Sequence, residues 1–336
     1  MYFAIVGKNP LLSKLELEKI AKIDSITSKA IFFDTENYEK CKFLAWSIKV
    51  GKLIPLDEFI SMDKKLIWTN ISLKPQDKQK YNIKRYKQVA IQKTDLEIKN
   101  KWIEVIFFPE FKNYVGVVDF YQNIPLYETI DYEKPIRSMD IGMMPSKLTH
   151  LMVNLATWLD YEKTIYDPFS GLGTTAMISN YLWNNVLASD INITPTKQNW
   201  KFWTWTEFYK PDFKAYFWKQ DITESFKNKI VNLTNFVVSE GFLWPKVWKF
   251  LNEKEALNLE KSFNQIYIKW IRNLLSLEKL EKIVITFPVY KLRNGDFYYF
   301  NSTYEEISKF AKLKPIEEVY YRKWQKVWRQ IVEIKK

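Results

Sequence analysis

Cysteine, histidine and glycine are scarce in this chain, and the shortages exclude whole classes of site. The 336 residues include one cysteine, Cys41, and one histidine, His150. A zinc site built from Cys and His ligands is therefore excluded, and we expect no metal. A single cysteine allows no intrachain disulfide, which is compatible with a reducing cytoplasm. Methylation of a pyrimidine ring carbon through a cysteine adduct is also disfavoured. Such chemistry needs a thiolate beside the methyl donor, and Cys41 lies far in sequence from 167–175, the segment that carries two closely spaced glycines.

Long apolar runs are missing as well. No stretch of eighteen apolar residues occurs, so we expect no transmembrane helix and no membrane partner. The N-terminus lacks a charged start followed by an apolar run and a small-residue cleavage site, so we expect no secretion signal and a cytoplasmic location. A hydrophobic content of 47% is ample for packed cores, and the length suggests two or three domains.

Positive charge is in excess. The formal net charge is +12, and the excess lies in two segments, 60–115 and 309–336. Clustered positive charge favours a polyanionic partner such as a nucleic acid. Most of the basic residues are Lys rather than Arg, a pattern that an AT-rich genome also produces, so charge alone leaves this question open.

Two of the eight glycines, Gly171 and Gly173, lie one residue apart in Asp167-Pro-Phe-Ser-Gly-Leu-Gly-Thr-Thr175. Apolar residues precede this segment, and 176–182 has the pattern of a helix. Strand, glycine turn and helix form the local design of a nucleotide-type cofactor site. Glycine lets the backbone approach a ligand closely, and the helix start offers unpaired N–H groups.

Three acids follow apolar runs in order along the chain: Asp167, Asp190 and Asp221. A carboxylate at Asp167 would repel a pyrophosphate but suits an ammonium or sulfonium group, as in S-adenosylmethionine (SAM). Asp190 is placed to accept hydrogen bonds from ribose hydroxyls, and Asp221 to meet the adenine amino group. A nicotinamide-dependent oxidoreductase stays as a disfavoured alternative, because the third glycine of a dinucleotide fingerprint is missing.

The segment 167–175 resembles the first SAM motif of the THUMP-containing tRNA guanine-N2 methyltransferases, which modify the position-10 guanine of tRNA. Four other segments resemble parts of the family in the expected order: 2–13, 115–123, 142–148 and 322–331. The resemblance implies a SAM-dependent transfer of a methyl group to the exocyclic N2 of a guanine in tRNA. It also implies a tRNA partner and a class I methyltransferase domain with a Rossmann-like α/β sheet.

We accordingly expect four regions: a ferredoxin-like α+β domain over 1–60, a THUMP-like RNA-binding domain over 61–125, an extended linker over 126–144, and the SAM-dependent methyltransferase domain over 145–336. In the first region, 12–21 and 38–50 have helical patterns. In the last, strands alternate with helices, and late strands near 318–321 and 329–334 suggest the antiparallel pair that closes a class I methyltransferase sheet.

The chain departs from the family at the fourth strand. The family carries Asp-Pro-Pro-Tyr there, whereas this chain has Ser239-Glu240-Gly241-Phe242. In the family the acid and a neighbouring carbonyl accept hydrogen bonds from the guanine amino group, and the aromatic residue stacks on the base. Phe242 keeps the stacking surface. Glu240 is one candidate proton acceptor and a carbonyl near Gly241 is another, although strand alternation would turn Glu240 away.

The expected site residues fall in two groups. The catalytic candidates are the four residues of 239–242. The expected cofactor contacts are Asp167, Phe169, Gly171, Gly173, Thr174, Asp190, Ile191, Asp221 and Ile222.

Other features are expected to be structural. His150 lies off the apolar stripe of its helix, so a structural or surface role is favoured. Trp203 is expected in the core rather than as a base-stacking residue. The alternatives to an active tRNA enzyme are a catalytically impaired SAM- or RNA-binding paralogue, one that needs a small activating subunit, and a DNA methyltransferase.

Overall fold

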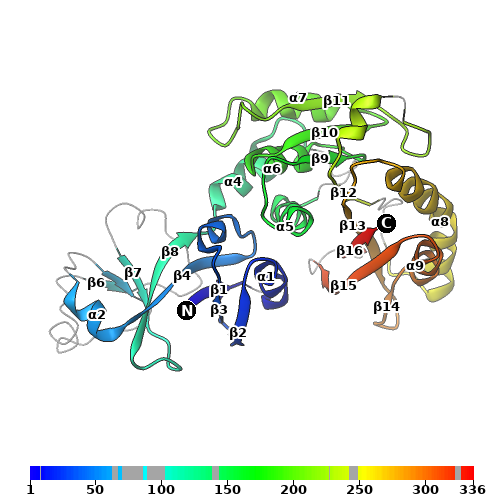
Figure 1. Cartoon of the computed structure of the whole chain (residues 1–336). Coiled ribbons are helices and arrows are strands. Elements are labelled where there is room, and N and C mark those ends of the chain that lie inside the picture. Colours follow the sequence, from blue (N-terminus) through cyan, green and yellow to red (C-terminus); the bar gives the residue numbers. More distant parts are fainter. Residues whose placement is uncertain are drawn as a thin grey trace. The chain divides into compact units, whose positions relative to one another are not determined.

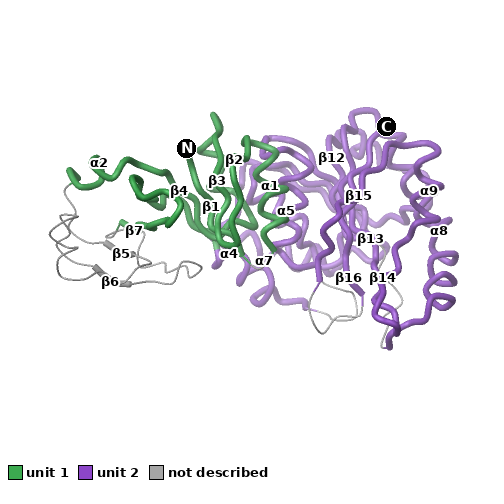
Figure 2. The backbone as a smooth tube through the Cα atoms, turned by 90° about the horizontal axis from the view of Figure 1, so that it is seen from below, with its two compact units in different colours: residues 1–123 green, residues 124–336 purple. Residues whose placement is uncertain are grey.

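The computed structural model describes residues 1–7, 9–62, 67–69, 86–88, 103–137, 144–226, 228–241, 249–321 and 327–336. Two compact units divide the chain at residue 123, as Figure 2 shows. None of the helices in these ranges is both long and apolar enough to cross a bilayer.

The first unit, residues 1–123, is built on one mixed sheet in the order β2-β3-β1-β4-β8-β7-β5-β6. Its strands are β1 (Tyr2–Val6), β2 (Lys22–Ile26), β3 (Ala30–Asp34), β4 (Ser47–Pro55), β5 (Ile67–Thr69), β6 (Tyr86–Gln88), β7 (Ile103–Ile106) and β8 (Tyr114–Tyr121). Its helices are α1 (Pro10–Leu17), the 3₁₀ turn η1 (Tyr38–Phe43) and α2 (Leu56–Ser61).

The helix expected over 38–50 is wrong. A short 3₁₀ turn occupies only Tyr38–Phe43, and Ser47–Pro55 is strand β4 in the middle of the sheet. The strand pairs with β1 on one side and β8 on the other, and these two ladders override the weak helical pattern.

The expected boundary at residue 60 falls inside helix α2, and the pairing of β4 with β8 runs across it. The structure therefore places 1–123 in one unit. Most of 63–102 lies outside the described residues, so the division into ferredoxin-like and THUMP-like domains stays a prediction.

The second unit, residues 124–336, contains a sheet in the order β11-β10-β9-β12-β13-β16-β15. Its strands are β9 (Thr164–Asp167), β10 (Asn185–Asp190), β11 (Ala215–Lys219), β12 (Phe236–Glu240), β13 (Lys282–Lys291), β15 (Lys312–Tyr320) and β16 (Val327–Lys335), with β14 (Phe297–Tyr298) paired to β13. Its main helices are α5 (Ser146–Thr157), α6 (Thr174–Tyr181), α7 (Thr194–Trp203), α8 (Glu253–Leu275) and α9 (Asn301–Ser308).

Strands β9 to β13 are parallel, and β16 runs antiparallel between β13 and β15. The chain builds outward from β9 through β10 to β11, then returns to the other side of β9 with β12 and β13. This is the doubly wound sheet with a closing antiparallel pair that the sequence predicted for a class I methyltransferase domain, and the prediction is confirmed at the level of topology.

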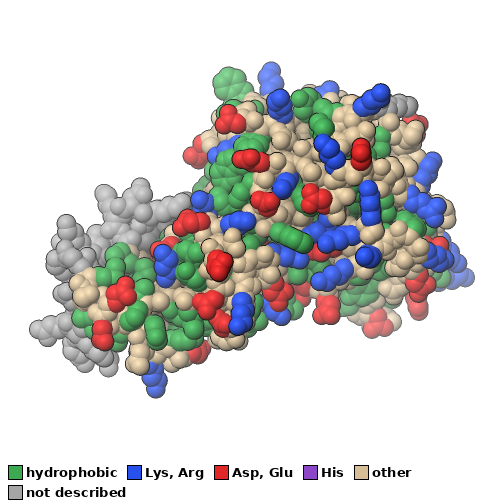
Figure 3. Space-filling view, viewed as in Figure 1, with side chains coloured by type: hydrophobic (Ala, Val, Ile, Leu, Met, Phe, Trp, Pro, Cys, Tyr) green, Lys and Arg blue, Asp and Glu red, His purple; other side chains and the backbone are tan. Residues whose placement is uncertain are grey.

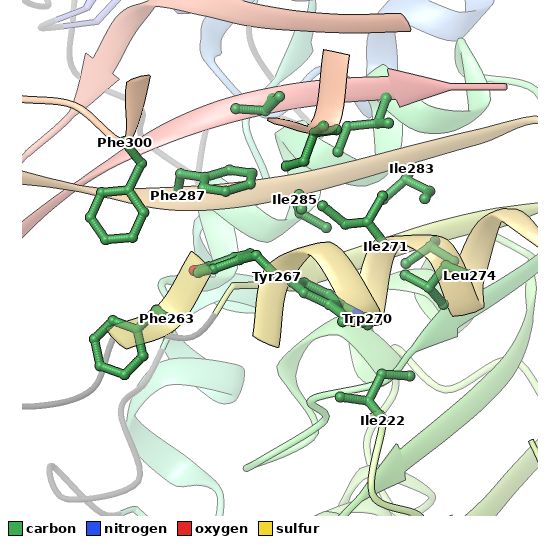
Figure 4. Packing of buried hydrophobic residues seen from close by; sticks show 14 of the residues in the cluster. Ile222, Phe263, Tyr267, Trp270, Ile271, Leu274, Ile283, Ile285, Phe287 and Phe300 are labelled. Atoms are coloured by element: carbon green, nitrogen blue, oxygen red, sulfur yellow. The ribbon is translucent and has the colours of Figure 1, made fainter. Parts of the chain in front are cut away.

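Helices cover both faces of this sheet (Figure 1): α5 and α6 lie on one side, α8 and α9 on the other. Alternation along β13 divides its side chains, so Ile283, Ile285 and Phe287 point toward α8 (Figure 4). Helix α8 begins with a capping box between Asn252 and Glu255, which satisfies its first backbone donors. Its buried face supplies Tyr267, Trp270, Ile271 and Leu274 to the core.

The segment expected to be an extended linker differs in its described part. Residues 124–137 contain α4 (Ile124–Glu128) and a π-helical turn, η3 (Thr129–Glu133). Leu126 and Ile130, one helical turn apart, are fully buried. This apolar spacing anchors the segment to the second unit instead of leaving it extended.

Candidate cofactor and acceptor site

The candidate site lies where the strand order reverses. Strands β9 and β12 are parallel neighbours, so their carboxyl ends, Asp167 and Ser239–Glu240, meet at one edge of the sheet. Helix α6, which follows β9, and helix α8, which follows β12, pack on opposite faces of the sheet, so the strand order reverses at this point. Ligands of open α/β sheets bind at such switch points.

The turn after β9 has the backbone that the two glycines predict. Gly171 and Gly173 have φ of 46° and 79°, both in the left-handed region. Gly173 caps the start of α6, and its amide donates to the Ser170 carbonyl at 2.6 Å. Thr196 of α7 holds the turn from outside, donating to the Gly171 carbonyl at 2.8 Å. The predicted turn from strand to helix is therefore present.

Asp167 ends β9 and is 3% exposed. Its Oδ1 accepts hydrogen bonds from the Phe169 amide at 3.1 Å and from the Ser239 hydroxyl at 2.6 Å. Burial raises the pKa of Asp167 to about 7, these two hydrogen bonds and one from the Thr175 hydroxyl partly offset the rise, and the nearby Asp190 raises the pKa further. A buried acid with such a pKa is a strong candidate to receive a cation, because an incoming positive charge restores the ionised form.

Asp190 lies at the end of β10, beside the glycine turn. Its Oδ2 accepts from the Gly171 amide and its Oδ1 from the Asn192 amide, both at 2.9 Å. Each carboxylate oxygen can accept two hydrogen bonds, so both oxygens keep acceptor capacity. The structure thus brings Asp167, the glycine turn and Asp190 together, as the sequence predicted.

The end of β11 is only partly as expected. It joins the same edge through the Gln220 amide, which donates to the Asp190 carbonyl at 3.1 Å. Asp221 is exposed, and its Oδ1 accepts from both the amide and the hydroxyl of Thr223, which lowers its pKa. Asp221 therefore stabilises its own turn, whatever ligand it also meets.

The three remaining apolar cofactor candidates have different surroundings. Ile191 is 67% exposed, whereas Ile222 is 4% exposed and packs in the core with α8 (Figure 4). Phe169 contacts Trp270 edge to face, with ring centroids 4.7 Å apart. Ile222 is thus a core residue in this structure, because α8, which follows it by some thirty residues, covers it.

The end of β12 shows how the altered motif is held. Ser239 is fully buried and points toward Asp167, whereas Glu240 points across β13 to form an ion pair with Arg329 of β16. The alternation that was expected to turn Glu240 away is confirmed. Glu240 as a proton acceptor beside the reacting group is not supported, because its carboxylate is held by a guanidinium from another strand.

Gly241 is enclosed by its neighbours. Its amide donates to Thr286 Oγ1 at 3.3 Å, and a Cβ atom here would lie 2.1 Å from the Thr286 carbonyl oxygen and 2.8 Å from the Tyr267 hydroxyl. Only glycine fits this packing. Phe242, the expected stacking residue, lies outside the described residues.

Besides Thr196, two further residues that the sequence did not indicate support the glycine turn and the start of α6. The Asn199 amide group donates to the Leu172 carbonyl at 3.0 Å and also bonds both backbone groups of Ile136, which ties 134–136 to the turn. The Lys134 ammonium, 1% exposed, donates to the Thr174 hydroxyl at 3.0 Å. The spacing of apolar and polar residues along the sequence predicts neither contact, because each joins segments that are far apart in the chain.

The residues expected to be structural are buried. His150 is 3% exposed, and its Nδ1 is 2.9 Å from the Tyr127 hydroxyl. Trp203 is fully buried, and its indole N–H donates to Asn180. Within the described ranges, His, Cys, Asp and Glu side chains form no group of three able to hold a metal ion.

No family model and no curated protein matches this chain. Its structure is similar to solved methyltransferases. One is the magnesium protoporphyrin IX methyltransferase of Synechocystis PCC 6803, solved with S-adenosylhomocysteine. The two sequences are 12% identical and the TM-score is 0.38; the match covers 63% of this chain and 94% of that one. Another is an rRNA methylase from Streptococcus thermophilus, at 11% identity, a TM-score of 0.37, and 57% and 97% coverage.

A third is the precorrin-6y C5,15-methyltransferase of Geobacter metallireducens GS-15, at 10% identity, a TM-score of 0.37, and 61% and 96% coverage. Similarity at this level leaves the ligand and the substrate to be argued from the residues of this chain.

Proposed function

We propose that this chain is a SAM-dependent methyltransferase that transfers a methyl group to the exocyclic N2 of a guanine in tRNA. The observation that carries the proposal is the pairing of a buried acid, Asp167, with a glycine turn at the switch point of the sheet. The resemblance of 167–175 to the SAM motif of the tRNA guanine-N2 family supports the choice of cofactor and substrate.

The residues at the strand ends fit this cofactor. The Asp167 carboxylate suits the ammonium or sulfonium end, the glycine turn leaves room for close approach, and Asp190 has acceptor capacity for ribose hydroxyls. Asp221, which follows β11 at the same edge of the sheet, is the candidate to meet the adenine amino group. When bound, SAM supplies the electrophilic methyl group.

Ser239 can supply part of the hydrogen-bond acceptance that the acid of Asp-Pro-Pro-Tyr provides in the family that this sequence resembles. Its hydroxyl donates to Asp167, which fixes its orientation and turns its oxygen lone pairs away from the acid. Those lone pairs can accept a hydrogen bond from an amino group on the substrate. The amine lone pair is delocalised into the base, so orientation and hydrogen-bond acceptors supply most of the help. A backbone carbonyl near Gly241 is the second acceptor candidate, and Phe242 is the candidate for base stacking.

The tRNA partner is supported by the resemblance and the net charge of +12. On the face seen in Figure 3, Lys and Arg side chains lie with acidic side chains among them. The described side chains on that face therefore form no continuous basic track, and the face adds no support for a tRNA partner. A small activating subunit remains part of the proposal, because the altered fourth motif lacks the family's acid.

The direct test is incubation of the chain with unmodified tRNA and SAM labelled in its methyl group, followed by nucleoside analysis. The expected product is N2-methylated guanosine, and Asp167→Asn should abolish the label whereas Asp160→Asn, at an exposed acid paired with Lys163, should not. If SAM binds but tRNA takes up no label, with or without cellular extract to supply a partner, the paralogue without catalytic activity is correct.

A DNA substrate is distinguished by the same assay with duplex and single-stranded DNA in place of tRNA. Label in DNA alone would overturn the choice of tRNA and keep the methyltransferase.

A further inference from the structure

The buried ammonium group of Lys134 has an unusual environment. Its side chain is 1% exposed, yet its single hydrogen-bond partner among the described residues is the neutral Thr174 hydroxyl, at 3.0 Å. It forms no ion pair with a described carboxylate. Asp131, three residues earlier, acts on it only at longer range, and the Asp131 Oδ1 atom accepts from the Ser146 amide.

Burial without a counter-ion is costly for a charged group. Burial lowers the pKa of Lys134 to about 8, although Asp131 partly offsets this effect. The ammonium is therefore still mostly protonated at neutral pH, in a place where no described carboxylate pairs directly with it.

A second positive feature lies beside it. Thr174 is the first residue of α6, so its neighbourhood carries the unpaired N–H groups and the partial positive charge of a helix start. A cation next to a helix N-terminus is electrostatically unfavourable, and proteins usually place acids there. Two positive features that converge at a glycine turn fit an anion that none of the described carboxylates supplies by direct contact.

The segment that carries Lys134 is held in place by packing. Asn199 bonds both backbone groups of Ile136 and also the Leu172 carbonyl, so the lysine is positioned by the same amide that supports the turn. Lys134 is therefore a fixed part of the turn's surroundings rather than a surface lysine folded inward.

We propose that Lys134 and the Thr174 hydroxyl bind the carboxylate of the amino-acid end of the cofactor, an assignment that rests on SAM being the ligand. Asp167 then receives the cationic groups of the same end, and Lys134 receives its anionic group. The cationic and anionic groups of the ligand's amino-acid end thus each contact a protein group of opposite charge, on two sides of one turn. This arrangement would discriminate SAM from adenosyl compounds that lack a carboxylate.

The test compares two ligands that differ only in that group, SAM and decarboxylated SAM, by isothermal titration calorimetry. The native chain should bind SAM at least tenfold more tightly. Lys134→Met, which keeps the length of the side chain and removes its charge, should weaken SAM binding at least tenfold and change the affinity for decarboxylated SAM less than twofold. Lys134→Arg, which keeps the charge, should retain a preference for SAM.

Each outcome decides a different question. Equal affinity of the native chain for the two ligands, or an equal loss for both in Lys134→Met, would overturn the carboxylate assignment while leaving the cofactor in place. Failure of the native chain to bind either ligand would overturn the proposed cofactor, and the carboxylate assignment with it. Should Lys134→Met not fold, the ligand preference of the native chain and of Lys134→Arg still decides.

Discussion

The ends of β9 and β12 are adjacent and parallel, yet their polar groups are used in different ways. At the end of β9, the Asp167 carboxylate is buried with a raised pKa, and its partners are the hydroxyls of Ser239 and Thr175 and the Phe169 amide. At the end of β12, Glu240 is already paired with Arg329, and Gly241 is locked against Thr286. The first end is prepared for an incoming charge, whereas the second satisfies its charge internally.

This difference separates two parts of the candidate site. The end of β9 leads into a glycine turn of the kind that nucleotide-type ligands use. At the end of β12, where the family that this sequence resembles carries an acid, the chain has the Glu240–Arg329 ion pair and Ser239, whose hydroxyl donates to Asp167.

The largest expected effect is at Asp167. Asp167→Asn keeps the shape but removes the charge that we propose faces the cationic end of SAM, and a charge-assisted contact in a buried site is worth roughly 3 kcal/mol. SAM affinity at pH 8 should fall about 100-fold, as measured by calorimetry. Asp160→Asn serves as the control, because that acid forms a surface pair with Lys163. An unchanged affinity in Asp167→Asn would remove the contrast between the two strand ends.

The next effect is on stability at Gly241. A Cβ atom there would lie 2.1 Å from a backbone oxygen, so Gly241→Ala should lower the free energy of unfolding by about 2–3 kcal/mol. Urea unfolding of the native chain and the variant measures this. Gly7→Ala is the matched control, because its Cβ would lie 3.7 Å from Ile48, an ordinary contact distance. If the two variants unfold alike, the end of β12 is not locked as described.

The Glu240–Arg329 pair gives a similar but smaller expected effect. Both side chains are mostly buried, at 16% and 6% exposure, so Glu240→Gln removes a charge that a buried guanidinium pairs with and should destabilise the fold by about 2 kcal/mol. The double variant Glu240→Gln with Arg329→Met should regain much of this loss. The rate of methyl transfer in Glu240→Gln, corrected for the fraction of folded protein, should stay within a few-fold of the native rate. A loss beyond 100-fold would show that Glu240 takes part in catalysis.

The smallest effect is a pH dependence. The pKa of Asp167 is raised to about 7, so the carboxyl is largely protonated below that pH and binds a cation less well. SAM affinity should rise about tenfold from pH 6 to pH 8 in the native chain and stay nearly flat in Asp167→Asn.

Stability without ligand should change in the opposite sense. The folded chain binds the Asp167 proton more tightly than the unfolded chain, whose acid has a pKa near 3.9. The native chain should therefore lose stability relative to Asp167→Asn as pH rises from about 4 to about 7. A native curve parallel to the variant's would show that Asp167 is not desolvated.

Much of the candidate cofactor site was predictable because its signals are local. The closely spaced Gly171 and Gly173 indicate a tight turn, and both have left-handed backbone in the structure. Asp167 and Asp190 come at the ends of short apolar runs. The errors arose where tertiary pairing decides. The helical pattern over 38–50 extends into the first residues of strand β4, and the burial of Ile222 against α8 has no signal in the local sequence.

The sequence by itself determined the α/β class, the turn between β9 and α6, and the order in which acids follow the parallel strands, since each depends on neighbours within a few residues. Only the tertiary structure decided the partners: Ser239 for Asp167, Arg329 for Glu240, and Thr174 for Lys134. These pairs join residues 40 to 89 positions apart, and the fold alone brings them within hydrogen-bonding distance, where burial makes each unmatched charge costly.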